Sequence, residues 1–301
     1  MKQYDSIIIG PVSLDINIDC EGNTRRELGG AVVQAGFAAG HCGFSSCVLT
    51  KAGAGVDVHE RFTGSGVDVK VLASESTCSI QNRYLTPDKE RRVCTSLSVC
   101  DKFTGEDLRT LEGISAEVYH FAGLVYGDFD AGIFEGISGK IAVDVQGFLR
   151  HVEEDRTMAF HDWQAKREYL PMIHYLKTDA AEAEILTGES DRYRAAEILS
   201  GWGAGEVMIT HNTEVLVFDG RKFYVCPIKA RNLSGRTGRG DTTFSGYINS
   251  RIRQEIPEAL LFASALVSLK METPGPFMGT AQDVRDYAAR FYPADSVRVS
   301  S

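Results

Sequence analysis

The chain has 301 residues, of which 43% are hydrophobic and 24% are charged. These proportions are typical of a globular protein, and the length suffices for one large α/β domain or two small ones. The net charge of −9 gives an overall field that repels nucleic acid. No apolar run is long enough for a membrane span, and the start MKQYDSIIIG lacks the apolar stretch of a signal peptide. We therefore expect a cytoplasmic protein with neither a nucleic-acid nor a membrane partner.

Seven cysteines occur without any C-x-x-C pair. Their odd number and their spacing argue against both a disulfide framework and a zinc site. Most have apolar neighbours, which predicts buried thiols. The seven histidines show no metal-ligand spacing, so we expect no structural metal.

The first hundred residues are predicted to form several strands and one helix. Strands are predicted at Ser6–Gly10, Leu14–Asp19 and Cys47–Thr50, with a helix of small residues at Ala31–Gly40. Three more strands follow at Val67–Leu72, Cys78–Tyr84 and Arg92–Leu97. The last two are predicted to form a β-hairpin with its turn at Pro87-Asp88.

After residue 115 the pattern alternates between strand and helix. Strands are predicted at Val118–Phe121, Ile141–Val145, His174–Lys177 and Val207–Thr210. Helices are predicted at Trp163–Ile173, Ala180–Leu186, Thr242–Arg253, Pro257–Met271 and Ala281–Arg290. This alternation favours a mainly parallel sheet flanked by helices. Without a repeat or linker, residues 1–301 read as a single α/β domain with a small β excursion.

The segment Gly235-Arg-Thr-Gly-Arg-Gly-Asp241 is the most informative motif, and an apolar helical pattern follows it directly. A glycine-rich turn that begins a helix leaves backbone N–H groups unpaired, and the helix dipole adds positive charge. We therefore expect a phosphate site here. A carboxylate in such a site would be repelled by phosphate unless it had a chemical task. Asp241 is accordingly the candidate general base beside a transferring phosphoryl group.

This motif differs from other phosphate loops. Gly139-Lys140 is followed by Ile141 and lacks the upstream glycine of a Walker A loop. The glycine order in residues 235–240 does not match a dinucleotide fingerprint. The remaining alternative is a turn that merely caps a helix.

Along nearly its whole length the chain resembles the ribokinase-like (PfkB) carbohydrate kinases. The family signature, roughly D-T-x-G-A-G-D-x-F, is matched at Thr237, Gly238, Gly240, Asp241 and, one residue late, Phe244. Further matches in the expected order are Gly10 with Asp15, the pair Gly29-Gly30, and Asp179-Ala-Ala-Glu182 for an N-x-x-E motif. The resemblance implies a three-layer α/β/α sandwich with a mainly parallel central sheet and a small β-sheet lid. The lid strands would come from residues 11–28 and 77–98.

The same resemblance implies an ATP-dependent kinase that phosphorylates a hydroxyl of a small sugar or cyclitol. Asp241 would be the base, and the N–H groups of Gly238, Arg239 and Gly240 would stabilise the transferring phosphoryl group. The implied substrate-binding residues are Asp15, Gly29, Gly30, Gln34 and Arg150, and the implied ATP-binding residues are Asp179, Glu182, Thr210 and Thr237. Mg²⁺ is implied with ATP, held by Glu182 through water. A monovalent cation is a further candidate cofactor, and the lid is a candidate homodimer surface.

The chain also departs from the family pattern. Gly235 and Arg236 replace Asp-Thr, Arg239 replaces alanine, Gln34 replaces asparagine, the nucleotide loop at 210–215 lacks both glycines, and Arg150 comes two places late after Asp144. These changes leave the acceptor and the nucleotide-loop geometry open. The Asp-Val-Gln and Leu-Gly-Gly stretches are similar to inositol-kinase-like members.

Several of these residues could instead have an ordinary structural role. Asp15 could be an exposed strand acid, Glu182 a surface residue at a helix start, and Arg150 the partner of Glu153 or Glu154.

Two other functions also stay open. A nucleoside kinase would need an aromatic stack, for which Phe103, Phe121 and Tyr126 are candidates, whereas a non-catalytic sugar-binding protein would gain nothing from Asp241.

Overall fold

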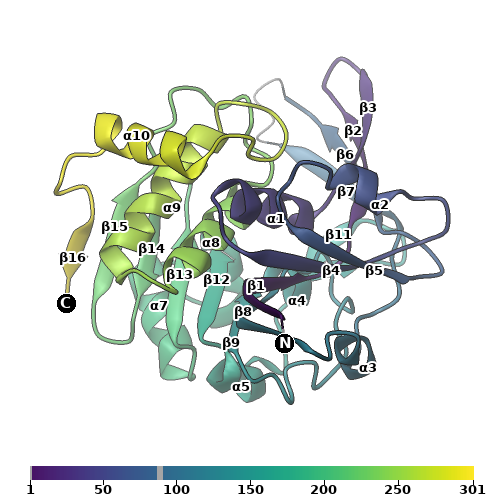
Figure 1. Cartoon of the computed structure of the whole chain (residues 1–301), viewed down its shortest axis with the longest axis horizontal. Helices are drawn as coiled ribbons and strands as arrows, with labels where there is room; N and C mark the ends of the chain where they lie inside the picture. Colours follow the sequence, from purple (N-terminus) through teal and green to yellow (C-terminus); the bar gives the residue numbers. More distant parts are fainter. Residues whose placement is uncertain (1, 87–90) are drawn as a thin grey trace.

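The computed structural model describes residues 2–86 and 91–301, and these form two sheets of very different size (Figure 1). In spatial order the large sheet contains β16 (Arg298–Ser300), β15 (Phe223–Pro227), β14 (Glu214–Phe218), β13 (Glu206–Thr210), β12 (Tyr175–Asp179), β9 (Lys140–Asp144), β8 (Ile114–Phe121), β1 (Lys2–Ile9), β4 (Ser46–Ala52) and β5 (Asp68–Ala73). The strands from β5 to β13 run parallel, and β14 to β16 are antiparallel.

Helices cover both faces of this sheet. One face carries α1 (Ala31–His41), α8 (Arg239–Ser250) and α9 (Ile256–Lys270), with α10 (Ala281–Phe291) packed on α9; the other carries α6 (Ala180–Thr187) and α7 (Arg192–Gly201). Alternate residues of a strand point to opposite faces. Tyr175 accordingly joins the core under α8 and α9, whereas Leu176 joins the core under α6 and α7. The expected three-layer sandwich with a mainly parallel sheet is confirmed.

The small sheet is built from two distant segments of the chain. Its order is β3 (Thr24–Gly29), β2 (Ser13–Ile18), β6 (Ser79–Tyr84) and β7 (Arg92–Ser98). The pairs β2–β3 and β6–β7 are antiparallel, and β2–β6 is parallel. These strands fall within 11–28 and 77–98 except that β3 ends one residue later, at Gly29, while the turn predicted at Pro87-Asp88 lies outside the described residues. Closure of this sheet as a lid and dimerisation through it stay predictions.

The remaining elements are short. They are α2 (Val58–Arg61), α3 (Gly105–Arg109), α4 (Gln146–Leu149), α5 (Lys166–Tyr169), a 3₁₀ turn (Leu170–Met172) and the hairpin of β10 (Arg150–Val152) and β11 (Met158–Phe160). The single helix predicted at 163–173 is thus divided in two, because Pro171 lacks the N–H that a continuing α-helix needs.

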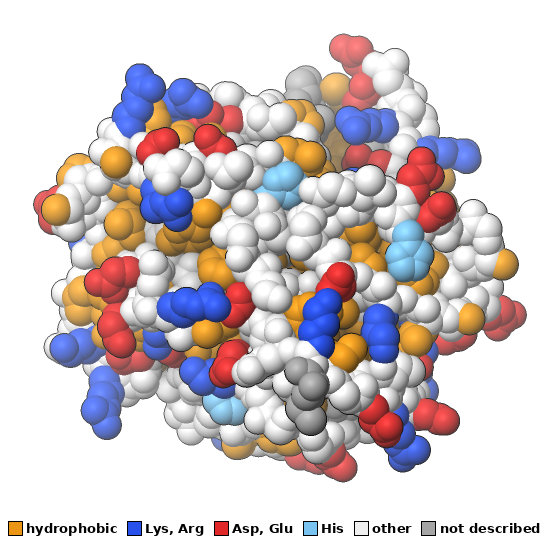
Figure 2. All heavy atoms as spheres, in the orientation of Figure 1, with side chains coloured by type: hydrophobic (Ala, Val, Ile, Leu, Met, Phe, Trp, Pro, Cys, Tyr) orange, Lys and Arg blue, Asp and Glu red, His pale blue; other side chains and the backbone are white. Residues whose placement is uncertain are grey.

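The state of the cysteines and the distribution of surface charge can be compared with what the composition predicts. Five cysteines are buried, Cys94 is half-buried and Cys20 is exposed, and all seven are free thiols. On the face shown in Figure 2, basic side chains lie interspersed with acidic ones instead of gathering in one patch. Within the described residues, each helix is too short or too polar to cross a membrane.

Candidate active site

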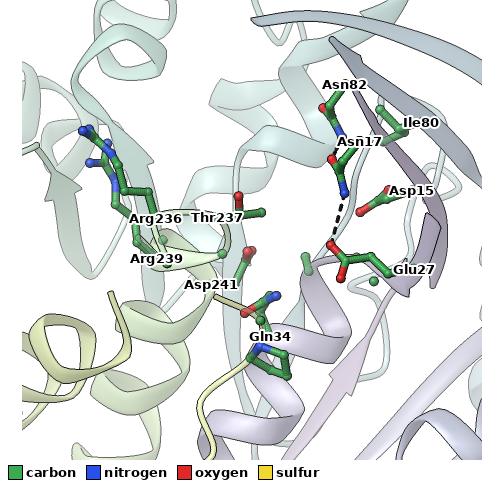
Figure 3. Close-up of a pocket in the computed structure, with 18 of the residues that line it drawn as sticks. Asp15, Asn17, Glu27, Gln34, Ile80, Asn82, Arg236, Thr237, Arg239 and Asp241 are labelled. Carbon is green, nitrogen blue, oxygen red and sulfur yellow. Dashed lines mark hydrogen bonds between the residues drawn. The ribbon is translucent and has the colours of Figure 1, made fainter. Parts of the chain in front are cut away.

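Every candidate site residue lines one cavity of about 570 Å³. It lies where the parallel strands end, because Asp144, Asp179 and Thr210 are the last residues of β9, β12 and β13. Ligands of open α/β sheets bind outside the carboxyl ends of the strands. The small sheet forms one wall of this cavity and the start of α8 forms the opposite wall (Figure 3).

The glycine-rich segment begins α8 as predicted, but three residues earlier than the apolar pattern indicated. Gly238 is the N-cap in the left-handed region, with φ of 76°. A Cβ there would lie 2.3 Å from Cδ of Gln34, so glycine is required both for its conformation and for this close approach. The two predicted site residues Gly238 and Gln34 therefore lie against each other.

The unpaired N–H groups differ from those expected. The N–H of Arg239 donates to the Arg236 carbonyl oxygen at 3.3 Å, because the segment closes a turn before the helix starts. Among the described residues, the N–H groups of Gly238, Gly240 and Asp241 have no acceptor. The Arg239 N–H, which the sequence analysis assigned to the phosphate site, is thus already engaged in the turn, whereas the Asp241 N–H is not.

Asp241 lies in the first turn of α8, at the centre of the cavity (Figure 3). Burial, together with the negative charge of Asp144, raises its pKa to about 6, while Lys177 and Lys270 oppose the rise. The carboxylate is thus still ionised at neutral pH, and its affinity for a proton is higher than that of an ordinary aspartate. Such a group can accept a proton from a hydroxyl during a reaction.

Lys177 is a site residue that the sequence reasoning missed. Its Nζ lies 2.9 Å from Oδ2 of Asp144 and 3.8 Å from Oε2 of Glu182. A Cβ on Gly240 would lie 3.2 Å from this Nζ, so the ammonium is adjacent to the phosphate cradle. The available signal was a lysine within the strand predicted at His174–Lys177, since a buried lysine needs a charged partner.

Asp179 and Glu182 form a capping box where β12 leads into α6. Oδ1 of Asp179 accepts from the Glu182 N–H at 2.8 Å, and Oε2 of Glu182 accepts from the Asp179 N–H at 2.7 Å. Glu182 is only 4% exposed, so its interpretation as a surface residue does not hold. Burial raises the pKa of Glu182 to about 7, although the Lys177 charge opposes the rise.

The small sheet contributes Asp15 at the opposite end of the cavity. Ser13 Oγ donates to Asp15 Oδ1 at 2.7 Å, and burial raises the pKa of this carboxyl to about 6. A Cβ on Gly29 would lie 2.9 Å from Asp15 Oδ2, so this glycine leaves room for the carboxylate. Gly30 follows as the N-cap of α1, with φ of 102°.

A chain of amides and a second acid continue this wall, and the sequence reasoning missed all three. Asn82 Nδ2 donates to Asn17 Oδ1, and Asn17 Nδ2 donates to Glu27 Oε1, each over 3.1 Å (Figure 3). Strand register explains the grouping, since Asn17 pairs with Asn82 and Asp15 with Glu27. Alternation in β2 places Asn17 on the same face as Asp15, a signal present in the sequence.

Gln34 and Arg150 complete the floor of the cavity. Among the described residues, the buried Oε1 of Gln34 has no hydrogen-bond partner. Arg150 is 8% exposed, and its Nη2 donates to Gln146 Oε1 at 2.5 Å. The alternative pairing of Arg150 with Glu153 or Glu154 is therefore wrong.

Arg236 and Arg239 point together, away from Asp15 and beyond Asp241 (Figure 3). Arg236 Nη2 donates to Asn212 Oδ1 at 3.4 Å. Asn212 belongs to the short turn between β13 and β14, where Thr210 pairs with Val215. The segment aligned with a nucleotide loop is therefore a tight hairpin, and an arginine of the phosphate segment reaches it.

The sequence profile of "pfkB family carbohydrate kinase" matches residues 9–279. The chain belongs to this family. A solved pyrophosphate-dependent kinase of the ribokinase family, complexed with a pyrophosphate analogue and myo-inositol, is 32% identical with a TM-score of 0.83, over 93% of this chain and 99% of that one. A pyrophosphate-dependent myo-inositol-1 kinase, converted into a myo-inositol-3 kinase by mutation, is 31% identical with a TM-score of 0.83, over 95% and 99%.

A curated relative has a different acceptor. It is the cytidine kinase of Thermococcus kodakarensis, 28% identical over 252 residues, which are 81% of this chain and 87% of that protein. The expected ribokinase-like fold is thus confirmed, and the kinases similar to this chain differ in their acceptors.

Proposed function

We propose that this pfkB kinase transfers a phosphoryl group from inorganic pyrophosphate to a hydroxyl of myo-inositol or a closely related cyclitol. Asp241 is the general base. The observation that carries the proposal is the position of Asp241, between two guanidinium groups at one end of the cavity and a wall of acids and amides at the other. A donor phosphate and an acceptor hydroxyl would meet at this carboxylate.

The acceptor end suits a small, neutral polyol. Carboxylates accept hydrogen bonds from hydroxyls, and amides both donate and accept them. Asp15, Asn17, Glu27 and Asn82 offer such groups from one side, and the side chain of Gln34 lies next to Gly238. The two similar inositol-related kinases support a cyclitol over a linear sugar.

The donor end suits a compact anion. The start of α8 supplies free N–H groups, and Arg236 and Arg239 add planar guanidiniums that match phosphate oxygens. Asn212 and the tight β13–β14 hairpin occupy the place of a glycine-containing nucleotide loop. These features favour pyrophosphate, which has no nucleoside to accommodate. ATP, implied by the family resemblance, is the second candidate donor.

The chemical step needs positioning and charge stabilisation more than covalent catalysis. As the acceptor oxygen attacks the nearer phosphorus of pyrophosphate, the Asp241 carboxylate takes its proton. The bond from that phosphorus to the bridging oxygen breaks, and inorganic phosphate leaves. The N–H groups of Gly238, Gly240 and Asp241 would donate to the oxygens of the transferring group, and the ammonium of Lys177 would add positive charge beside them.

The residues present also fit Mg²⁺. The capping box uses one oxygen each of Asp179 and Glu182 and leaves the other available. Among the described residues, the one group of three donors at metal-ligand spacing is Cys78, Cys100 and Asp128, none of which lines this cavity. An ion that keeps water ligands and shares donor phosphates suits such a site. Mg²⁺ would be held by Glu182 and Asp179 through water and would neutralise phosphate charge.

A nucleoside kinase is the second candidate function, because of the cytidine kinase relative. Of the three aromatic residues proposed for base stacking, Phe103 and Phe121 are fully buried in the core. Tyr126 is exposed, stacks on His151 and does not line the cavity. Among the described residues, Tyr84 is the one aromatic side chain that lines it. This composition favours a cyclitol over a nucleoside.

A matrix of donors and acceptors tests the proposal. The purified protein would be incubated with Mg²⁺ and either pyrophosphate or ATP, each with myo-inositol, ribose or cytidine, and products followed by ³¹P NMR. We expect a phosphate monoester from pyrophosphate and myo-inositol. Turnover with ATP but not with pyrophosphate would overturn the donor assignment. A preference for cytidine as acceptor would establish the nucleoside kinase. Stabilisation by an acceptor without turnover in any combination would instead indicate a non-catalytic sugar-binding protein.

A further inference from the structure

Lys270, the last residue of α9, holds the segment that leads into the phosphate cradle. Its side chain is buried, with 2% of the residue exposed. Its Nζ donates to the carbonyl oxygen of Gly235 at 2.7 Å and also to that of Thr237. The Gly235 N–H donates to the Met271 carbonyl oxygen at 2.7 Å. The segment is therefore fastened to the end of α9 at both of these residues.

The attachment leaves no space for the aspartate that the family signature has at position 235. A Cβ on Gly235 would lie 1.9 Å from the carbonyl oxygen of Thr273. Glycine at this position thus allows the segment to lie directly on the end of α9. The loss of the signature aspartate and the presence of the buried Lys270 ammonium occur at the same point of the structure.

The direction of the Thr237 carbonyl fixes a cradle donor. In a planar trans peptide the C=O and the following N–H point in opposite directions. Because the Lys270 ammonium binds the Thr237 oxygen, the N–H of Gly238 is turned away from Lys270. This N–H is one of the three in the cradle that have no acceptor among the described residues. Lys270 is thus a positioning residue, which acts through the backbone of the phosphate segment.

We propose that the Lys270 ammonium is a built-in cation for this loop, so that phosphoryl transfer needs no added K⁺ or Na⁺. A monovalent ion that ordered the segment would need its inward carbonyl oxygens as ligands, and those of Gly235 and Thr237 are already bound by Lys270. The monovalent cation implied by the family resemblance therefore does not fit at these two oxygens. The inference rests on the proposed function for its kinetic measurement and is independent of it for donor binding.

The charges around Lys270 suit this role. The carboxylates of Asp241 on α8 and Glu27 on β3 are the charged groups that favour its protonation. Burial nevertheless lowers its pKa from 10.5 to about 8, so the ammonium is present at neutral pH and is lost in mild alkali. The helix C-terminus, where Lys270 lies, also favours a positive charge.

Binding of pyrophosphate, measured by calorimetry without acceptor, tests the proposal independently of turnover. Lys270→Met should weaken binding at least about tenfold, the effect of losing one charge-assisted hydrogen bond. Lys270→Arg should retain most of the affinity. Lys229→Met is the matched control, because Lys229 Nζ also donates to a carbonyl oxygen, that of Phe291 at 2.9 Å, and does not line the cavity. Wild-type affinity in Lys270→Met would overturn the proposal.

Rescue and pH distinguish an ordering charge from simple packing. In Lys270→Ala, ammonium or methylammonium should restore pyrophosphate binding, whereas Lys229→Met should not respond. For the wild type, affinity should fall as the pH rises through about 8. The free energy of unfolding should instead rise between pH 8 and 10.5, because a lysine whose folded pKa is depressed binds fewer protons in the native state than in the unfolded state over this range. Affinity with no step near pH 8, or no rescue, would show that Lys270 only packs.

The kinetic test uses wild-type enzyme with pyrophosphate and myo-inositol. Rates in potassium, sodium and tetramethylammonium salts at equal ionic strength should agree within about twofold. A rate at least about tenfold higher in potassium or sodium would overturn the built-in cation. If no salt gives turnover while Lys270→Met still weakens pyrophosphate binding, the proposed function fails and the role of Lys270 stands.

Discussion

Lys177 and Asp144 form a buried ion pair next to Gly240, at the start of α8. The ammonium contacts both carboxylate oxygens, at 3.1 and 2.9 Å, and both side chains are less than a tenth exposed. They come from neighbouring parallel strands, β12 and β9, whose register pairs these two residues. The pair therefore connects the central sheet to Gly240, whose Cα lies next to the Lys177 side chain.

Breaking this pair from one side should destabilise the protein strongly. Lys177→Met leaves Asp144 and Glu182 buried without their cation, and such losses cost about 3–5 kcal/mol. The free energy of unfolding from urea denaturation measures this effect. The double variant with Asp144→Asn should lose less than the sum of the two single variants, because one of the two carboxylates left unpaired is then neutralised as well. Additive losses would show that the two groups do not depend on each other.

Replacement of the candidate base should separate chemistry from binding. Asp241→Asn keeps the size of the side chain but removes the proton acceptor, so turnover should fall by about 10²–10⁴. Calorimetric affinity for pyrophosphate should stay the same or rise, since a negative charge beside the phosphate is removed. The rate constant from single-turnover experiments is the measurement. A variant with near-normal turnover would remove Asp241 from the mechanism.

The rate should also depend on pH through Asp241. Its pKa is raised to about 6, so log kcat/KM should fall with unit slope below that pH, where the base is protonated. Asp15 and Glu182 also titrate in this range, near pH 6 and pH 7, so the profile has to be repeated with Asp15→Asn and with Glu182→Gln, in which the Asp241 limb should persist. Fold stability depends on pH in the opposite direction: activity rises with pH through Asp241, whereas the free energy of unfolding falls. A carboxyl with a raised folded pKa destabilises the native state as the pH rises from 3.8 through 6. Asp241→Asn should therefore raise the melting temperature at pH 7, and an unchanged value would contradict the burial cost.

The fold and the centre of the site could be predicted because they depend on local patterns. The alternation of strand and helix after residue 115 indicates a parallel sheet, and the carboxyl ends of such strands meet at one edge. The glycine motif places Asp241 at a helix start from sequence alone. Asp179 and Glu182 were assigned through the resemblance to the family's N-x-x-E motif, whose spacing is also that of the capping box they form.

The parts that could not be predicted depend on contacts between distant segments. Glu27 and Asn82 reach the wall of the cavity that contains Asp15 through strand pairing with β2, and Lys177 becomes a candidate site residue only because α8 begins next to it. The hydrogen bond that occupies the Arg239 N–H depends on the turn that precedes the helix. Lys270 reads in the sequence as an ordinary basic residue at a helix end. Its role arises because residues 235–237 fold back onto the C-terminal end of α9.

The two ends of the cavity should respond to substitution independently. Asp15→Ala removes a carboxylate that can accept hydrogen bonds from acceptor hydroxyls, each contributing about 1.5–3 kcal/mol. It should lower kcat/KM for the acceptor by about ten- to a few-hundred-fold and barely change the KM for pyrophosphate. Gln34→Ala should have the same selectivity with a smaller effect, because an amide is neutral.

Arg236→Ala is the reciprocal variant, because its guanidinium lies at the far end from Asp15 (Figure 3). It should raise the KM for pyrophosphate at least about tenfold, the loss expected for one charge-assisted contact to phosphate. Saturation curves for each substrate, at a saturating concentration of the other, measure both effects in the same three variants. The assignment of the ends requires that Asp15→Ala and Arg236→Ala show opposite selectivity. Equal losses for both substrates in either variant would mean that the cavity is not divided into an acceptor end and a donor end as proposed.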